Sequence, residues 1–275
     1  MSTSAETRRT EIIEILERER YLKVVDLSQR FGVSQMSIRR DLRQLEEQGL
    51  LSRVHGGLIA TPLLRLGLEI SPNVARQIRD CRLEKKEIAR AAAALVQPGD
   101  HLIFDSGILS YFTACSLPGV LLIQGELTVI TNSLPVALEL APWSGVETIL
   151  LGGEYQANRM MNVTGPSSLR SLEGLHADKM FLTVEAIDIA HGVTISMNGD
   201  ERLLAKRMIA ACNCVVLLAL GCKIGEVEQH QILTPGEFQT LVTDQECPAK
   251  FVSHLRNQGA NVIRVQPIQR KTLCP

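Results

Sequence analysis

Apolar residues in the first fifty positions recur with the period of a helix. The spacing predicts an amphipathic helix over residues 6–20, whose apolar face carries Ile12, Ile13 and Leu16. A second helix follows and is expected to end at Gly32, because glycine readily takes the left-handed conformation that follows a helix C-terminus. The chain therefore begins with two short helices joined by a tight connection.

A third helix is predicted from Ser34, whose side chain can cap it, to about Gln48. Its apolar positions form one stripe and are Ile38, Leu42 and Leu45. The next segment, LLSRVHGGLI, alternates in polarity and is expected to turn at Gly56 and Gly57 as a small β-hairpin. Three helices and a hairpin thus occupy the first sixty residues.

The rest of the chain has a different pattern, in which short apolar runs alternate with helical stretches. LEKKEIARAAAALVQPGD predicts a helix with an alanine-rich face. The predicted strands are HLIFD, LTVIT, VETILLGG, KMFLTVEAI, CVVLLAL, TLVTD and NVIRV. Strands that alternate with helices favour a mainly parallel sheet covered by helices, so this part is expected to be an α/β domain.

The length of 275 residues favours two domains. We predict a helix–turn–helix domain over residues 1–60, a linker over 61–80 that contains two prolines, and an α/β domain over 81–275. The sequence has no apolar run of about 18 residues, so we predict no membrane span. Its polar start differs from that of a signal peptide. The seven cysteines are scattered without a C-x-x-C pair, which favours reduced thiols in a cytoplasmic protein and indicates no metal site or cofactor.

The third helix concentrates positive charge in a chain whose net charge is −1. Beside the apolar stripe, its outer face carries Gln35, Met36, Ser37, Arg39, Arg40 and Arg43. In the DNA major groove, arginine can form two hydrogen bonds with guanine and glutamine can do so with adenine, while other arginines hold phosphates. Arg53 and His55 in the hairpin, and the amides after Ser34, would add contacts to a duplex. We therefore predict double-stranded DNA as a partner.

A basic helix face also has a simpler interpretation. The arginines could be a solvated surface, balanced by Asp41, Glu46 and Glu47 on the same helix. The helix–turn–helix arrangement and the following hairpin favour the DNA interpretation over this one. Because one such module reads only a half-site, a DNA-binding protein of this kind is expected to be a homodimer or homotetramer.

Small polar residues follow three of the predicted strands. They are Asp105 and Gly107, then Thr131, Asn132 and Ser133, then Gly152 and Gly153. Ligands of open α/β sheets bind at the carboxyl ends of the strands, where free amides favour a phosphate. Glycine and serine are also ordinary turn residues. The pattern therefore indicates either a phosphate-bearing ligand or unremarkable strand ends.

VSQMSIRRDLRQLEEQGLLSRVHGG, residues 33–57, resembles the signature of the DeoR/GlpR family of bacterial transcriptional regulators. The likeness continues through EKKEIARAAAALVQPGD, TNSLPVALELA, LLGGEY, GPSSLRSL and HGVT. The resemblance implies a winged helix–turn–helix and a C-terminal domain similar to sugar-phosphate isomerases. It also implies a repressor of a carbohydrate-use operon, whose DNA binding is weakened by a phosphorylated sugar.

The resemblance also implies an effector site. Matched position by position, it would include Asp105, Gly107, Ser110, Thr131, Asn132, Ser133, Gly152, Gly153, Glu185, Glu201, Lys206 and Lys223. A lysine near a phosphate acts as a point charge, and carboxylates can hold sugar hydroxyls. Solvated charge is the alternative interpretation for Glu201, Lys206 and Lys223.

The chain departs from the family pattern at three places. DSGILS has Ile108 and Leu109 where the family has hydroxyls, LGCK has Leu220 and Cys222 where it has an acid and a hydroxyl, and TVEA replaces a glycine-rich acidic segment. Lost hydroxyls weaken contact with a hydrated sugar phosphate. The effector could therefore be atypical, less polar or absent, or the two apolar residues could be a structural repacking.

Two further functions were weighed against the ligand-controlled repressor. One is a regulator of the same architecture that has lost its effector response. The other is a residual isomerase, for which Glu185, Glu201 and His191 are the nearby candidates, although His191 fits a turn residue better. The sequence contains no nucleophile triad, phosphate-binding loop or metal-ligand spacing, so we expect no enzymatic activity.

Overall fold

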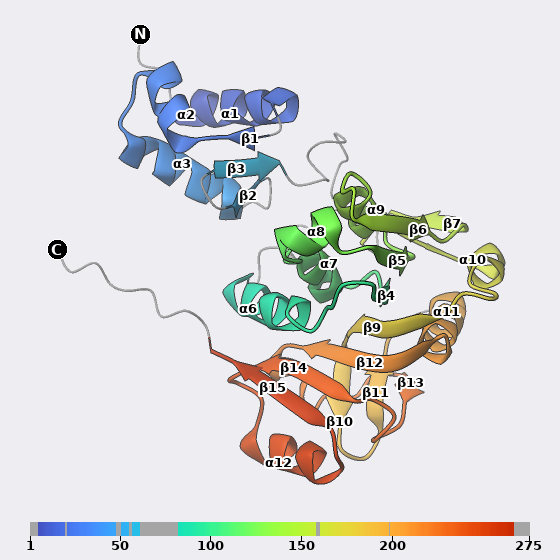
Figure 1. The fold of residues 1–275 in the computed structure, drawn as a ribbon. Coiled ribbons are helices and arrows are strands. Elements are labelled where there is room, and N and C mark those ends of the chain that lie inside the picture. The colour runs from blue at the N-terminus through green and yellow to red at the C-terminus, as the bar shows by residue number, and fades with distance from the viewer. Residues whose placement is uncertain are drawn as a thin grey trace. The chain divides into compact units, whose positions relative to one another are not determined.

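The computed structural model describes residues 5–19, 21–47, 51–54, 57–60, 82–157, 160–197 and 199–266 (Figure 1). The chain divides into two compact units, residues 1–80 and 81–275. Within the described ranges, we find no helix with the length and apolar character needed to cross a bilayer. Each unit is a separate folding problem and is described by itself below.

The first unit combines three helices with a small antiparallel sheet. The helices are α1 (Ala5–Glu19), α2 (Val24–Phe31) and α3 (Gln35–Glu47), and the strands are β1 (Tyr21–Leu22), β2 (Leu51–Val54) and β3 (Gly57–Ala60). The strand order is β1-β3-β2, with β3 antiparallel to both neighbours. The three predicted helices are confirmed, whereas β1 was not predicted, because two residues are too few to show a strand pattern.

The local signals in the first unit act as expected. Gly32 ends α2 with φ of 61°, and Ser34 precedes α3. The predicted apolar stripe of α3 is buried together with residues of α1, β1 and α2; this core comprises Ile12, Ile15, Leu22, Leu27, Ile38, Leu42 and Leu45. The predicted β-hairpin is confirmed: β2 and β3 are antiparallel and Val54 pairs with Gly57, which is the first residue of β3. His55, Gly56 and Gln48 lie outside the described residues.

The second unit is built on one seven-stranded sheet in which every neighbouring pair is parallel. Its order is β15-β14-β12-β9-β4-β5-β6. The strands are β4 (His101–Phe104), β5 (Leu127–Thr131), β6 (Val146–Leu150), β9 (Ala177–Thr183), β12 (Cys212–Ala219), β14 (Thr240–Asp244) and β15 (Asn261–Val265). The prediction of an α/β domain with a mainly parallel sheet is confirmed.

Helices cover both faces of this sheet (Figure 1). The helices are α6 (Arg82–Ala93), α7 (Ile108–Ala114), α8 (Gly119–Gln124), α9 (Leu134–Leu140), α10 (Pro166–Ser171), α11 (Gly199–Ala210) and α12 (Ala249–Asn257), with a 3-10 turn, η1 (Gly221–Lys223). α6 packs against β12, β14 and β15, and α7 against β4, β9 and β12. On the other face, Leu172 at the end of α10, Leu204 of α11 and Phe251 of α12 form one core with Ile103, Met180 and Leu217 of the strands.

Two small sheets were not predicted. One pairs β7 (Glu154–Gln156) with β8 (Asn162–Thr164), and the other has the order β10-β11-β13, formed by β10 (Ala186–Asp188), β11 (Gly192–Ile195) and β13 (His230–Leu233). The prediction of one strand through KMFLTVEAI was wrong, because β9 ends at Thr183 and β10 joins a different sheet. The Glu185 carboxylate accepts hydrogen bonds from the backbone and hydroxyl of Ser196, at 2.7 and 2.9 Å, where the chain changes sheets.

Candidate DNA-binding surface and effector site

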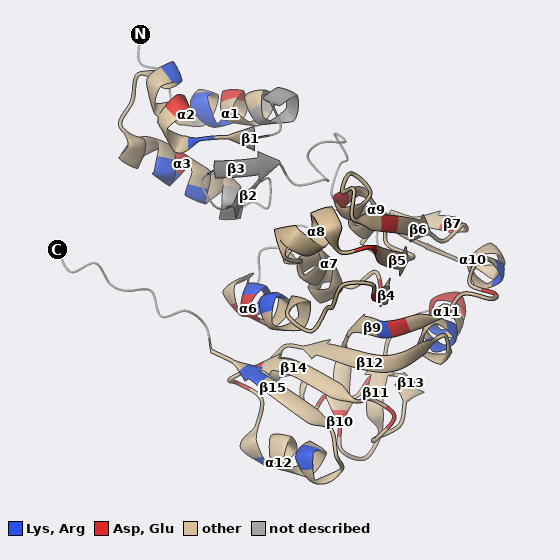
Figure 2. Cartoon of the chain, in the orientation of Figure 1, with Lys and Arg blue, Asp and Glu red and all other residues tan. Residues whose placement is uncertain are grey.

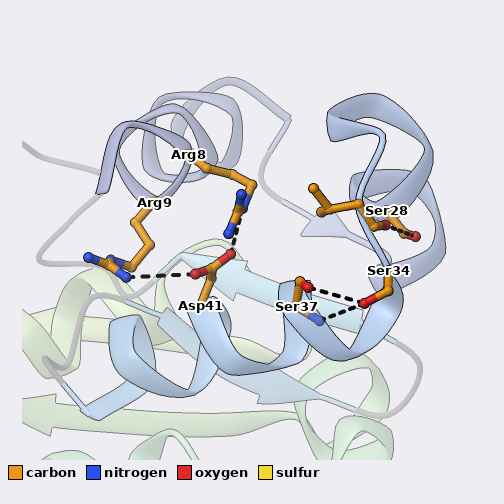
Figure 3. Close-up of polar contacts among 7 residues, drawn as sticks. Arg8, Arg9, Ser28, Ser34, Ser37 and Asp41 are labelled. Atoms are coloured by element: carbon orange, nitrogen blue, oxygen red, sulfur yellow. Dashed lines mark hydrogen bonds and ion pairs between the residues drawn. The ribbon is translucent and has the colours of Figure 1, made fainter. Parts of the chain in front are cut away.

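The turn before α3 is held by serine side chains (Figure 3). Ser34 Oγ accepts a hydrogen bond from the Ser37 backbone at 3.2 Å, which caps the helix as predicted, and the two hydroxyls are 3.1 Å apart. Ser28 Oγ donates to the Val33 carbonyl at 2.7 Å. These contacts fix the direction in which α3 leaves the turn, and therefore which of its faces is exposed.

The exposed face of α3 carries the residues predicted to contact DNA. Of the predicted residues on α3 and at its cap, Ser37 is half-buried and the others are exposed: Ser34, Gln35, Met36, Arg39, Arg40 and Arg43. Met36 has 76% of its surface exposed, whereas Ile38 and Leu42 have none. Figure 2 shows the basic residues spaced along α3. Arg53 lies on β2, but its side chain and all of His55 are outside the described part of the chain.

Asp41 does not belong to this exposed face. It is buried, and its carboxylate is 2.6 Å from Arg8 Nε and 3.7 Å from Arg9 Nη1, both on α1 (Figure 3). The interpretation in which Asp41 balances the outer arginines of α3 was therefore wrong. Asp41 instead joins the exposed helix to α1 through a buried ion pair, a function that sequence spacing did not reveal.

The second candidate site begins at the carboxyl end of β4. Asp105 is buried and accepts hydrogen bonds from Ser110 Oγ and, at 3.3 Å, from the Thr183 backbone. Burial raises the pKa of Asp105 to about 6, although the bonds from Ser110, Thr183 and Gly107 act in the opposite direction. Ser110 also donates to the Phe181 carbonyl at 2.9 Å. Asp105 and Ser110 thus form one buried unit between β4 and β9.

Gly107 is required by close packing at this strand end. A Cβ atom at Gly107 would lie 2.1 Å from both Cβ and Oγ1 of Thr183. The Thr183 hydroxyl in turn accepts a hydrogen bond from the Ser110 backbone at 3.1 Å. Any side chain at Gly107 would therefore force β4 and β9 apart at the edge where a ligand is expected.

The hydroxyls that follow β5 are used within the protein. Thr131 Oγ1 donates to the Phe104 carbonyl at 2.8 Å and accepts from the Ser133 backbone at 3.0 Å. Ser133 Oγ caps α9 by accepting from the Val136 backbone at 3.4 Å. Asn132 is also buried, and its Nδ2 donates to the Val163 carbonyl at 3.3 Å. Thr131 and Ser133 therefore shape the strand end, while Asn132 Oδ1 has no hydrogen-bond donor within the described part of the chain.

The two glycines after β6 contact α10. Ser168 Oγ donates to the Gly152 carbonyl at 2.6 Å, and the Gly152 backbone donates to Ser171 Oγ at 3.3 Å. Gly153 has φ of 149°, and a Cβ there would lie 2.1 Å from Ser168 Oγ. The glycines thus allow the chain after β6 to approach α10 closely, at the same edge of the sheet as Asp105.

The charged residues carried over from the resemblance have different surroundings. Glu201 is buried in the first turn of α11, and Lys223 is exposed in η1, after the carboxyl end of β12. Glu185 is bound to Ser196 as described above. Lys206 is exposed farther along α11, where its charge helps the Thr234 backbone to lower the pKa of Glu237, which precedes β14. Lys206 therefore lies toward the amino edge of the sheet and is not brought together with Asp105.

Asn162 was missed by the sequence analysis. It lies on β8, and its Nδ2 donates to Ser106 Oγ at 3.1 Å and to Glu201 Oε1 at 3.3 Å. It thereby links segments 56 and 39 residues away in sequence. No local pattern marks such a residue, because its importance depends on where β8 crosses the ends of β4 and α11.

The departure at DSGILS is accommodated in the core. Ile108 and Leu109 are buried in α7, a helix whose residues are all buried. Two apolar side chains in this position pack within the domain. The structure therefore favours the repacking interpretation, with Ser110 retaining its hydroxyl beside Asp105.

A helix–turn–helix with an antiparallel hairpin, together with an α/β domain that gathers buried polar groups at one sheet edge, defines a DNA-binding regulator with a sensor domain. Residues 8–61 match the DeoR-like helix-turn-helix domain, and residues 81–245 match the DeoR C terminal sensor domain. The chain belongs to the DeoR family of transcriptional regulators, which confirms the resemblance seen in the sequence.

Relatives are similar to this chain over most of its length. An uncharacterized HTH-type transcriptional regulator of Bacillus subtilis, YulB, is 33% identical over 96% of this chain and 98% of the relative. A putative aga operon transcriptional repressor of Escherichia coli O157:H7 is 30% identical over 96% of this chain and 95% of the relative. Among solved structures, a probable sor operon regulator from Shigella flexneri is 12% identical, with a TM-score of 0.41 over 69% of this chain and 91% of that chain.

Proposed function

We propose that this regulator represses a carbohydrate-use operon and that a phosphorylated sugar, bound to the sensor domain, lowers its affinity for DNA. The observation that supports the first half is the exposed face of α3, which presents Gln35, Arg39, Arg40 and Arg43 beside a capped helix start. The relatives named as operon repressors support the choice of repression. The proposed organisation is a DNA-binding domain over residues 1–60, a linker over 61–80 and a sensor domain over 81–275.

Replacing Arg40 or Arg43 by alanine is expected to weaken operator binding. An arginine that contacts a base contributes about 1–3 kcal/mol of specificity, whereas one that contacts a phosphate lowers the salt slope by about one. Fluorescence anisotropy with the chain's own upstream DNA, at about 50 to 200 mM salt, measures both quantities. Arg207→Ala, an exposed arginine on α11, is the matched control. Wild-type affinity and salt slope in both α3 variants would contradict this docking.

The effector half is tested by the same assay. Titrating a panel of sugar phosphates into the protein–DNA complex should identify at least one that releases the DNA. Lys223→Ala is expected to weaken that response about tenfold, because an exposed ammonium at this edge can contact a phosphate, and to leave DNA affinity unchanged. Lys206→Ala, on the same domain but toward the other edge, should respond as wild type does. Equal loss in both variants would exclude a local role for Lys223.

A second candidate is a regulator that no longer senses a sugar phosphate. Leu220 and Cys222 in place of polar residues favour it, while the burial of Ile108 and Leu109 removes part of its support. DNA binding that no compound in the panel disturbs would select this function. Absence of specific DNA binding at low salt would contradict both candidates.

We propose no catalytic function for the sensor domain. His191 lies in the exposed turn between β10 and β11, where its backbone and Nδ1 contact Asp188 Oδ1 at 2.6 and 2.9 Å. Glu185 is engaged by Ser196. An acid and a base held over one carbon of a substrate would be needed for isomerisation. Assay of sugar-phosphate isomerisation by the purified protein tests this directly.

A symmetric dimer or tetramer is expected, because paired modules are needed for a two-fold operator.

A further inference from the structure

Two buried side-chain amides lie where β5 and β8 cross. Asn132 is 6% exposed and Asn162 is 3% exposed. Ser133 and Asn162 form an isolated β-bridge, and the Val163 backbone donates to the Asn132 carbonyl at 2.8 Å, so the two residues belong to one backbone crossing. The backbones of Asn132 and Asn162 are therefore adjacent.

The orientation of each amide is fixed by its partner. Asn132 Nδ2 faces the Val163 carbonyl at 3.3 Å, and Asn162 Nδ2 faces Glu201 Oε1 at 3.3 Å. A carbonyl oxygen cannot donate a hydrogen bond, so turning the Asn132 amide over would place two acceptors against each other. Asn162 Nδ2 faces two acceptors, Ser106 Oγ at 3.1 Å and Glu201 Oε1, which use both of its hydrogens. In each residue Oδ1 points away from these partners.

Both Oδ1 atoms are buried without a hydrogen-bond donor among the residues that the structure describes. A buried acceptor without a donor destabilises the folded protein, because it has lost its hydrogen bonds to water. Here two occur at one crossing. Two acceptors without donors at the carboxyl edge of a parallel sheet fit a binding site whose ligand carries hydrogen-bond donors.

The surroundings of the two oxygens are rich in acceptors. Glu201 contributes a buried carboxylate, and Asp105, also buried, follows the adjacent strand β4. Ser106 and Gly107 are only half-buried, so the crossing lies just beneath the surface at this edge. The chemical complement of such a cluster is a ligand with several hydrogen donors on neighbouring atoms, which is the character of a polyol or an amino-polyol.

We infer that Asn162 and Asn132 recognise the polyol part of the effector, their Oδ1 atoms accepting hydrogen bonds from its hydroxyl or amino groups. This rests on the proposed sensor function and extends it to the part of the ligand remote from the phosphate. Asn162 is the specificity-determining residue, because it reaches Ser106 on one segment and Glu201 on another. A site built to bind a hydroxyl discriminates strongly against the analogue that lacks it.

The test compares ligands as well as variants. Glucose 6-phosphate, galactose 6-phosphate and ribose 5-phosphate, each with its monodeoxy and amino analogues, are titrated against the full-length protein bound to its upstream DNA. Ligand binding without DNA is followed by the shift in melting temperature. In the wild type, removal of one particular hydroxyl from the active compound should weaken its binding about tenfold or more. An amino analogue that equals or exceeds its parent identifies the donor as an amine.

Asn162→Ala should weaken binding of the active compound by a similar factor. In addition, it should remove the difference in affinity between that compound and its deoxy analogue. The matched control is Asn213→Ala. Asn213 is an exposed residue of β12 whose side chain contacts His176 at 2.9 Å, and its variant should retain the difference in affinity between the two compounds. DNA affinity should be unchanged in both variants.

Each other result overturns the inference. If a compound releases DNA but every deoxy analogue works equally well, or if Asn162→Ala preserves the discrimination, then the amides are not the hydroxyl site, although the sensor function stands. If Asn162→Ala does not fold, the wild-type comparison of deoxy analogues still decides. If no compound shifts the melting temperature or releases DNA, both the inference and the effector half of the proposed function fail, while DNA binding is judged by its own titration.

Discussion

Asp41→Ala is expected to destabilise the N-terminal unit by about 3–5 kcal/mol, the usual effect of breaking a buried ion pair by removing one partner. The carboxylate is buried 2.6 Å from the guanidinium of Arg8, itself 8% exposed. Without it, Arg8 loses its buried ion pair and α3 keeps only its apolar contacts with α1. Specific DNA binding should fall with the stability of this unit, since the exposed arginines depend on the placement of α3.

Urea unfolding, followed by circular dichroism, measures the stability change, and anisotropy measures DNA binding. Asp26→Ala, an exposed acid in the first turn of α2, is the matched control and should have a small effect only. Replacing Arg8 and Asp41 together by leucines should restore much of the stability, because an apolar pair carries no desolvation penalty. A stability of Asp41→Ala within about 1 kcal/mol of wild type would show that the ion pair does not hold the helices together.

The second large effect is a pH dependence that originates at Asp105. Its pKa is raised to about 6 in the folded protein from 3.8, so the folded state favours the protonated acid. The resulting stabilisation is fully present below about pH 3.8 and is lost as the pH rises through about 6. A shift of about two pKa units corresponds to about 3 kcal/mol.

Asp105→Asn should remove this dependence, because an amide does not ionise and keeps one of the two acceptor oxygens that bind Ser110 and Thr183. The difference in unfolding free energy between the variant and the wild type should therefore move in favour of the variant by about 2 kcal/mol between about pH 4 and pH 7. Glu147→Gln, at an exposed position on β6, is the control for a lost carboxylate. A difference that stays constant across this range would mean that Asp105 ionises as readily in the folded protein as in the unfolded one.

The sequence was sufficient for those parts of the fold that local chemistry determines. The spacing of Ile38, Leu42 and Leu45 identified the buried face of α3, and its exposed face followed as the remainder. Gly32 and Ser34 marked a helix end and a helix start through their own backbone and side-chain preferences. The apolar strand runs showed the parallel sheet, since strands buried on both faces are apolar throughout.

Residues whose role depends on distant partners were not predictable in this way. Asp41 appeared only in the alternative interpretation of a solvated basic face, because its partner Arg8 on α1 is 33 residues earlier in the chain. Asn162 lies in a three-residue strand with no pattern of its own. Lys206 was carried over by position, although one helix can carry Glu201 to the carboxyl edge and Lys206 toward the other.

The order of the sheet has a consequence for synthesis on the ribosome. β4 pairs with β5 on one side and with β9 on the other, and β9 ends 79 residues after β4. At about 5–20 residues per second, the free edge of β4 waits about 4–16 s for its partner. During that interval β4, β5 and β6 can form part of the sheet, with α7 and α9 already made on one face and with the other face and one edge open. The emerging sensor domain therefore passes through a stage in which chaperones, or a neighbouring nascent chain, can compete for that edge.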